Sequence, residues 1–151
     1  MIQRIQTLFL LAVAVLSGLL LTGNLVQLST PGGTLFNLGF NGLGENGGGI
    51  IQRLWPMSVI LALVPLLAVT AIFLYKKRNL QMRLTMIALL LSLGTVILGA
   101  FYIVTFDRKI DVTVVWTVKA VFPLLSAILS WLAYRAILKD EMKVRSYNRL
   151  R

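Results

Sequence analysis

The stretch WPMSVILALVPLLAVTAIFLY, residues 55–75, contains no charged residue and decides what kind of protein this chain forms. A helix needs about 20 apolar residues to cross the roughly 30 Å hydrocarbon core of a bilayer, because it rises about 1.5 Å per residue. Residues 55–75 are long enough for one crossing. Three further apolar runs are predicted to cross as well: residues 7–22, 84–105 and 112–138.

The composition of the whole chain is that of a membrane protein. Of its 151 residues, 58% are hydrophobic and 13% are charged, against about 45–50% and about 25% in ordinary soluble proteins. The chain has no Cys and no His. A thiolate nucleophile, an iron–sulfur cluster and imidazole ligands for haem or zinc are therefore excluded, and we expect neither a cofactor nor a metal site.

Basic residues orient the predicted helices, because short cytoplasmic segments of membrane proteins are enriched in Lys and Arg. If both termini lie in the cytoplasm, 11 of the 15 basic residues lie on that side. They are Arg4, Lys76, Lys77, Arg78, Arg83, Arg135, Lys139, Lys143, Arg145, Arg149 and Arg151. This asymmetry predicts that both termini are cytoplasmic.

The runs and their orientation predict an all-α integral membrane protein, an antiparallel four-helix transmembrane bundle that forms a single domain over residues 1–151. Short connections make neighbouring helices antiparallel. Small residues at three- and four-residue spacing, such as Ala88, Ser92 and Thr95, favour close helix packing in lipid. No A-x-A cleavage pattern ends the first run, so we expect it to be retained rather than removed as a signal peptide.

The external loop, residues 23–54, holds nine of the twelve glycines. Within it, NLVQLST and TLFNLGF alternate in part between apolar and polar residues on either side of Pro31, which predicts a β-hairpin on the outer surface of the bundle. The following NGLGENGGG lacks the strand and helix context of a phosphate-binding loop. Exposed Leu and Phe side chains on the hairpin are costly in water, so we expect the loop to contact a partner protein or to cover a lipid cavity.

Lys119 lies about seven residues into the predicted fourth helix, roughly 10 Å from its outer boundary at helical rise. A charge at depth in a bilayer is costly, so this side chain needs a partner. It is expected to reach the outer surface or to pair with Asp107 or Asp111. The alternative is that it binds an anionic lipid headgroup or a partner subunit.

The basic tail, residues 139–151, is expected to hold the end of the fourth helix in the cytoplasm. Arg145, Arg149 and Arg151 are candidate contacts with anionic lipid headgroups or with a partner protein. The tail has none of the RNA-binding or DNA-binding signatures that can be tested in a sequence, so no nucleic-acid partner is expected.

Three segments carry a resemblance to a known family: the opening MIQRIQTLFLLAV, the connection RNLQMRL and the tail RAILKDEMKVRSYNRLR. They resemble a bacterial family of four-pass inner-membrane proteins that is described only as a domain of unknown function. The resemblance spans essentially the whole chain and is most specific at residues 1–7 and in the tail. It implies a location in the bacterial inner (cytoplasmic) membrane and implies no activity, substrate or catalytic residue.

The function expected from these features is non-enzymatic, that of an accessory or assembly subunit of a larger membrane complex. The alternative is a small transporter or lipid-binding protein that uses a cavity near Lys119. No Asp or Glu lies within the apolar interiors, which argues against proton-coupled transport. A membrane enzyme is the third hypothesis, but no Ser has a candidate His base and no catalytic residue can be named.

Overall fold

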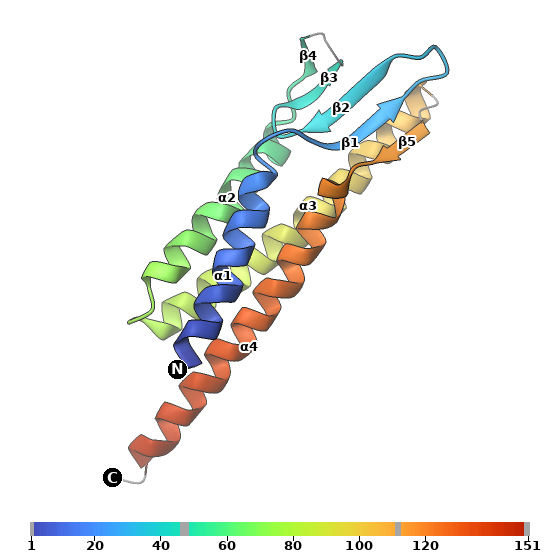
Figure 1. Ribbon diagram of the computed structural model, residues 1–151. Helices are drawn as coiled ribbons and strands as arrows, with labels where there is room; N and C mark the ends of the chain where they lie inside the picture. The colour runs from blue at the N-terminus through green and yellow to red at the C-terminus, as the bar shows by residue number, and fades with distance from the viewer. Residues whose placement is uncertain (1, 46–48, 111–112, 150–151) are drawn as a thin grey trace.

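The computed structural model describes the backbone of residues 2–45, 49–110 and 113–149, and the side chains of residues 5–45, 49–108 and 113–142. Within this part of the chain, long helices run side by side and a β-sheet covers one end of them (Figure 1). The helices are α1 (Ile2–Leu19), α2 (Trp55–Phe73), α3 (Arg78–Ile110) and α4 (Phe122–Arg149), with a short 3-10 helix, η1 (Val118–Val121). The strands are β1 (Asn24–Ser29), β2 (Leu35–Gly39), β3 (Gly42–Glu45), β4 (Ile50–Gln52) and β5 (Thr113–Trp116).

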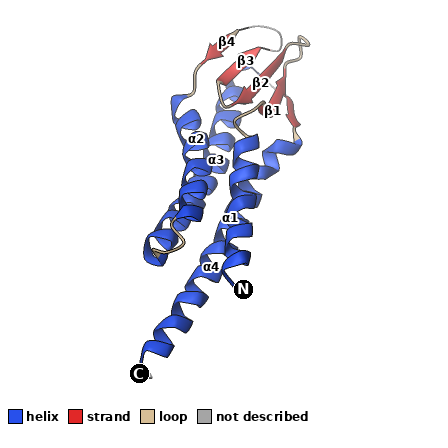
Figure 2. Ribbon diagram, turned by 60° about the vertical axis from the view of Figure 1, so that its left-hand side comes forward, coloured by secondary structure: helices blue, strands red, loops and turns tan. Residues whose placement is uncertain are grey.

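The predicted all-α fold is wrong, because the described chain contains a five-stranded sheet in the order β4-β3-β2-β1-β5. Every neighbouring pair of strands is antiparallel. The hairpin predicted around Pro31 is the pair β1–β2, but the sheet continues beyond it on both sides. The segment after this hairpin supplies β3 and β4, which lie beside β2 (Figure 2). Strand β5 comes from much later in the chain (Figure 1). The fold is therefore a mixture of helices and sheet.

Strand β5 occupies a segment that was predicted to begin the fourth transmembrane helix, residues 112–138. Its sequence, TVVW, contains three β-branched residues and one aromatic residue, which favour a strand over a helix. It pairs with β1 through Val26↔Trp116 and Leu28↔Val114. The strand and η1 use the first residues of the run, and α4 begins only at Phe122.

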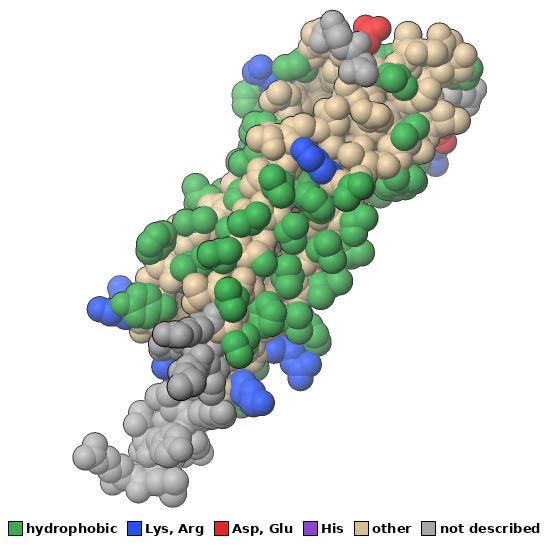
Figure 3. Space-filling view, viewed as in Figure 1, with side chains coloured by type: hydrophobic (Ala, Val, Ile, Leu, Met, Phe, Trp, Pro, Cys, Tyr) green, Lys and Arg blue, Asp and Glu red, His purple; other side chains and the backbone are tan. Residues whose placement is uncertain are grey.

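Three helical segments of the described chain are long and apolar enough to cross a membrane: Trp55–Phe73, Arg78–Arg108 and Val118–Met142. The described side chains of α1 form a shorter apolar helix, Ile5–Leu19. Hydrophobic side chains also cover the visible face of the helical body between its two ends (Figure 3). These lengths and surfaces are compatible with a membrane protein.

The helices bury a set of small and hydroxyl-bearing residues together with a few large apolar ones, and they leave many large apolar side chains exposed. On α1, Leu10, Val13 and Ser17 are buried, whereas Leu8 and Leu11 are at least half exposed. A water-soluble helix has the opposite pattern, whereas helices in lipid pack through small residues and present large apolar side chains outward. The buried hydroxyl-bearing residues on these helices are Ser17, Thr85, Ser92, Thr95, Ser126 and Ser130.

A cluster of buried apolar residues joins the sheet to the helices. Leu28, Leu38 and Leu43 lie on the face of the sheet that meets Met57 and Leu61 of α2. Because strand side chains alternate between the two faces, the residues between these leucines point away from the helices. One face of the sheet therefore packs against the helices, and the other face points away from them.

Candidate functional site

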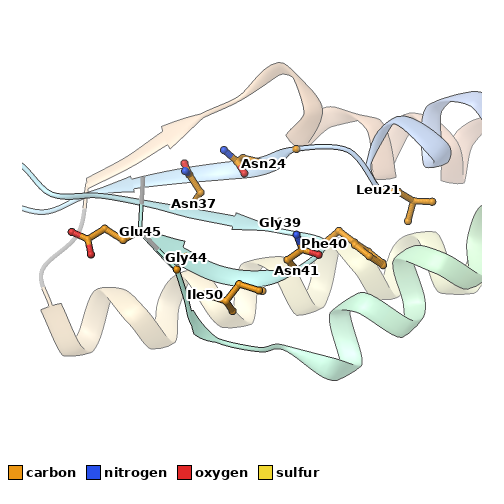
Figure 4. A pocket seen from close by; sticks show the side chains of 12 residues that line it. Leu21, Asn24, Asn37, Gly39, Phe40, Asn41, Gly44, Glu45 and Ile50 are labelled. Atoms are coloured by element: carbon orange, nitrogen blue, oxygen red, sulfur yellow. The ribbon is translucent and has the colours of Figure 1, made fainter. Parts of the chain in front are cut away.

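The open face of the sheet carries a polar hollow, which we call the outer dish (Figure 4). The register places Gln27, Asn37 and Gly44 side by side on this face, one position away from the buried leucines. Glycines have no side chain to fill the space above the strands, so the surface is hollowed to a volume of about 200 Å³. The lining residues are Leu21, Gly23, Asn24, Asn37, Gly39, Phe40, Asn41, Gly42, Gly44, Glu45, Gly49 and Ile50.

Two of the dish glycines are required by the backbone as well. A Cβ atom at Gly42 would collide with the carbonyl oxygen of Gln52, and Gly42 has φ +112°, which L-residues rarely adopt. A Cβ atom at Gly39 would lie 2.7 Å from the carbonyl oxygen of Gly23. The absence of a side chain at Gly42 lets the start of β3 approach the end of β4, and its absence at Gly39 lets the end of β2 approach the segment before β1.

The outer dish has the chemistry of a hydrogen-bonding surface rather than of a catalytic or metal site. Asn24, Asn37 and Asn41 supply amide groups that both donate and accept hydrogen bonds. Among the described residues of the lining, Glu45 is the one that is charged, and none is basic. No group of three His, Cys, Asp or Glu side chains capable of holding a metal exists among the described residues. The dish therefore suits uncharged polar groups such as peptide amides.

The sheet has two edge strands that flank this surface. On β4, which borders the outer dish, Ile50 is 49% exposed and Ile51 is 58% exposed. On β5, at the opposite edge, Val115 and Trp116 are also exposed. Strand edges of this kind present unpaired backbone groups together with apolar side chains, which is the arrangement that accepts an additional strand.

Lys119 is placed differently from the sequence-based prediction. It lies in η1, between β5 and α4, and not inside a continuous transmembrane helix. Its Nζ atom donates a hydrogen bond to the backbone carbonyl oxygen of Thr22, just after the end of α1. The structure shows no ion pair between Lys119 and Asp107, and Asp111 lies outside the described residues. Contact of Lys119 with a lipid headgroup or a partner subunit stays a prediction.

The family comparison covers nearly the whole chain. The model of one family, described as a domain of unknown function (DUF4293), matches residues 2–150. The chain belongs to the DUF4293 family. This confirms the resemblance to a domain of unknown function, while the bacterial source stays a prediction. No curated protein and no solved structure matches this DUF4293 chain.

An apolar cavity of about 110 Å³ lies beneath the sheet of the DUF4293 chain, close to Lys119 in sequence. Trp116 and Ala120 line it from the β5 and η1 segments, and Gly99 and Ala100 line it from α3. Lys119 itself is not among its lining residues. The full lining consists of Leu25, Val26, Leu38, Met57, Thr95, Val96, Gly99, Ala100, Ile103, Trp116, Ala120 and Pro123.

Basic residues of the DUF4293 chain gather at the other end of the helices, far from the sheet (Figure 3). Arg78, at the start of α3, forms a salt bridge with Asp140 of α4, with 3.4 Å between Nη1 and Oδ2. Helix α4 continues through Arg149. The side chains of the candidate contact residues Arg145, Arg149 and Arg151 lie outside those that the structure describes.

Sequence reasoning missed the outer dish and the Arg78–Asp140 pair for the same reason. Both depend on residues that come together only when separate elements pack. The glycine-rich composition of the loop was a signal for the dish, but clustered glycines are equally typical of a loop without strands. In the sequence, Asp140 has a nearer candidate partner, Lys143, three residues later on the same helix.

Proposed function

We propose that this DUF4293 chain is a non-enzymatic protein of the bacterial inner membrane that acts as an accessory or assembly subunit of a larger membrane complex. In this proposal both termini lie in the cytoplasm, and the sheet lies on the outer side of the membrane. The observation that carries the proposal is the exposed edge of β4 beside the outer dish. Together they offer a partner both a strand edge and a hydrogen-bonding surface.

The exposure of β4 supports the proposal that a protein partner binds there. Ile50 and Ile51 are about half exposed on a strand with a free edge, and Ile50 also lines the outer dish. An exposed apolar edge promotes unwanted pairing unless a specific partner covers it. An extended peptide added along β4 gains backbone hydrogen bonds. A neighbouring segment of the same partner can then cover the dish, where the Asn side chains offer hydrogen bonds to its polar groups.

The hydroxyl groups of the helices support a structural role rather than catalysis. The Oγ of Ser92 donates to the carbonyl oxygen of Ala88 at 2.8 Å, and the Oγ1 of Thr85 donates to that of Gln81 at 2.8 Å. A nucleophile needs a base within reach, and the chain has neither His nor Cys. The hydroxyl groups of Thr85 and Ser92 are thus satisfied by carbonyl oxygens of α3.

The first test is gentle detergent extraction of the tagged full chain from its native host, followed by mass spectrometry of the proteins that co-purify in stoichiometric amounts. The Ile51→Lys variant places a charge on the β4 edge and is expected to lose the partner. The matched control is Thr34→Lys, which places the same charge at the exposed turn between β1 and β2. Equal partner recovery from both variants would exclude the β4 edge as the contact surface.

A second candidate function is lipid or solute binding in the apolar cavity beneath the sheet. Its apolar lining and its position between β1, α3 and η1 favour a hydrocarbon chain as the occupant. Replacing Gly99 with Leu would fill this cavity. A lipid that co-purifies with the unmodified chain and is lost from Gly99→Leu, while the protein partner is retained, would support this candidate over the first.

A further inference from the structure

A second surface lies at the opposite end of the molecule, and we call it the basic groove. It consists of two adjoining cavities, of about 390 Å³ and about 440 Å³, that share Asn79. The first is lined by Lys76, Lys77, Arg78, Asn79, Leu80 and Glu141. The second is lined by Asn79, Met82, Arg83, Met86, Tyr134 and Leu138. The groove thus runs between the start of α3 and the later part of α4.

The charges in the groove favour an anionic ligand. Arg78 is engaged by Asp140, so its charge is already balanced. Lys76, Lys77 and Arg83 are exposed. Of the described residues that line the two cavities, Glu141 alone is acidic, so these three cations outnumber it. A phosphate group is the anion that clustered Lys and Arg side chains bind most readily at a membrane surface.

The second cavity changes from polar to apolar along α3. Asn79 and Arg83 line it from α3 together with Met82 and Met86, which stand one helical turn apart, and Leu138 lines it from α4. Met86 is 42% exposed and Leu138 is 36% exposed. A free phosphate ion does not need this apolar continuation. A phospholipid does, because its acyl chains begin a few bonds from its phosphate.

Aromatic residues place the groove at the level of lipid headgroups. The guanidinium of Arg135 lies 4.9 Å from the centre of a Trp131 ring, and the Nζ of Lys76 lies 5.9 Å from the centre of the Tyr75 ring. Trp and Tyr favour the interface between water and hydrocarbon. Both cation–π pairs lie at the basic end: Trp131 and Arg135 on α4, and Tyr75 and Lys76 in the turn between α2 and α3.

We propose that the basic groove binds one anionic phospholipid. Its phosphate lies near Asn79, where the two cavities meet, with Lys76, Lys77 and Arg83 as its cations. The beginning of an acyl chain lies along Met82, Met86 and Leu138. This inference needs only that the chain is embedded in a membrane, and it does not depend on the partner proposed for the sheet.

The test uses the full chain in a neutral detergent and measures bound lipid by native mass spectrometry. Phosphatidylglycerol and phosphatidylcholine with identical acyl chains are titrated separately, and phosphatidylglycerol is expected to bind more tightly. Arg83→Gln is expected to weaken phosphatidylglycerol binding about fivefold, since one basic residue near an anionic surface contributes about 1 kcal/mol. Arg83→Lys is expected to retain most of the binding.

The matched control is Arg108→Gln, which removes the same charge from the far end of α3. Circular dichroism and the elution volume in size-exclusion chromatography show whether each variant folds. If Arg83→Gln does not fold, the double variant Lys76→Gln/Lys77→Gln tests the same group of cations independently. Equal binding of the two lipids would overturn the proposal. An equal loss in Arg83→Gln and Arg108→Gln would also overturn it.

Competition separates a lipid from a free phosphate group. Deacylated glycerophosphoglycerol and inorganic phosphate are each added to the phosphatidylglycerol complex. If the apolar half of the groove contributes to lipid affinity, neither glycerophosphoglycerol nor inorganic phosphate displaces phosphatidylglycerol when added at the same concentration as the lipid. Displacement by either compound at an equal concentration would show that the groove holds only a phosphate group, which would overturn the assignment of a phospholipid.

Discussion

The Nζ of Lys119 donates a hydrogen bond to the carbonyl oxygen of Thr22, a residue 97 positions earlier in the chain. The last carbonyl groups of a helix have no partner within it and carry a partial negative charge. At the end of α1 the carbonyl groups of Ser17, Gly18 and Leu19 accept from the backbone N–H groups of the three residues that follow the helix. Lys119 instead satisfies the carbonyl of Thr22 in the turn after α1. The same contact ties the start of the α4 segment to the end of α1.

Replacing Lys119 by Met is expected to lower the free energy of unfolding by about 1 kcal/mol. The lost hydrogen bond has a charged donor, but its partial exposure to solvent reduces its contribution. The measurement is the midpoint of thermal unfolding in detergent. Lys119→Arg is expected to recover part of the loss, because it keeps the charge. The control Lys139→Met removes an exposed charge at the basic end and is expected to leave the midpoint unchanged.

Gly23→Ala probes the same contact from the other side. The added Cβ would lie 2.7 Å from Lys119 Nζ, at a position with φ +99°. Its effect is therefore expected to be smaller in the Lys119→Met background than in the unmodified chain. Strictly additive effects would show that Gly23→Ala acts through backbone strain alone.

Gly42→Ala is expected to destabilise the sheet by at least about 2 kcal/mol, because the added Cβ collides with the backbone at Gln52 and the residue has positive φ. Gly49→Ala is the matched control, since its Cβ would meet nothing within 4 Å. Limited proteolysis of the connection between β3 and β4 measures the effect. Similar cleavage rates for both variants would contradict the close approach seen here.

The Arg78–Asp140 pair is expected to contribute a coupling energy of roughly 0.5–1 kcal/mol in a double-mutant cycle, because the side chains are 26% and 14% exposed and so are only partly screened by solvent. The cycle uses Arg78→Gln, Asp140→Asn and the double variant, followed by thermal unfolding. Asp107→Asn, an exposed acidic residue near the other end of α3, is the single-charge control. A coupling energy of zero would mean that the pair does not hold α3 to α4.

Ser126 and Ser130 are buried in α4, and their Oγ atoms have no hydrogen-bond partner in the described chain. An unsatisfied buried hydroxyl costs about 1–3 kcal/mol, so Ser126→Ala and Ser130→Ala are expected to leave the thermal midpoint unchanged or raise it. Ser92→Leu is expected to lower the midpoint, because extra volume in this packed core costs about 1–3 kcal/mol. A marked loss in Ser126→Ala would indicate that its hydroxyl binds an internal water in the cavity of about 10 Å³ beside it.

The proposed orientation can be tested directly, because the chain contains no Cys. Thr34→Cys marks the sheet and Asn79→Cys marks the connection between α2 and α3. In spheroplasts, a membrane-impermeant maleimide is expected to label the first variant at once and the second only after permeabilisation. The reverse pattern would invert the proposed topology and place the sheet in the cytoplasm.

Sequence patterns located the helices well because those signals are local. The run at 55–75 became α2, which ends at Phe73, and the run at 84–105 lies inside α3. Helix α3 nevertheless begins at Arg78 and continues to Ile110, through a segment that was expected to be a loop. A helix satisfies its own backbone hydrogen bonds, so it continues past the apolar residues that mark a crossing.

Local sequence patterns predicted only part of the sheet. Partial alternation around Pro31 was enough to predict β1 and β2, because a hairpin is a short-range structure. Nothing local could predict that residues 113–116 would pair with β1, since both a strand and a helix accommodate a short apolar run. Whether residues 113–116 form a strand or a helix depends on whether the free edge of β1 lies beside the segment after α3.

The sequence by itself determined the apolar lengths of the helices, the asymmetry of charge between the two ends and the exclusion of thiol and imidazole chemistry. These properties depend on residue type and spacing alone. Tertiary structure decided the five-stranded sheet, the outer dish, the Arg78–Asp140 pair and the partner of Lys119. Each of these joins segments far apart in the chain, and such contacts form only where packing brings the segments within a few ångströms of each other.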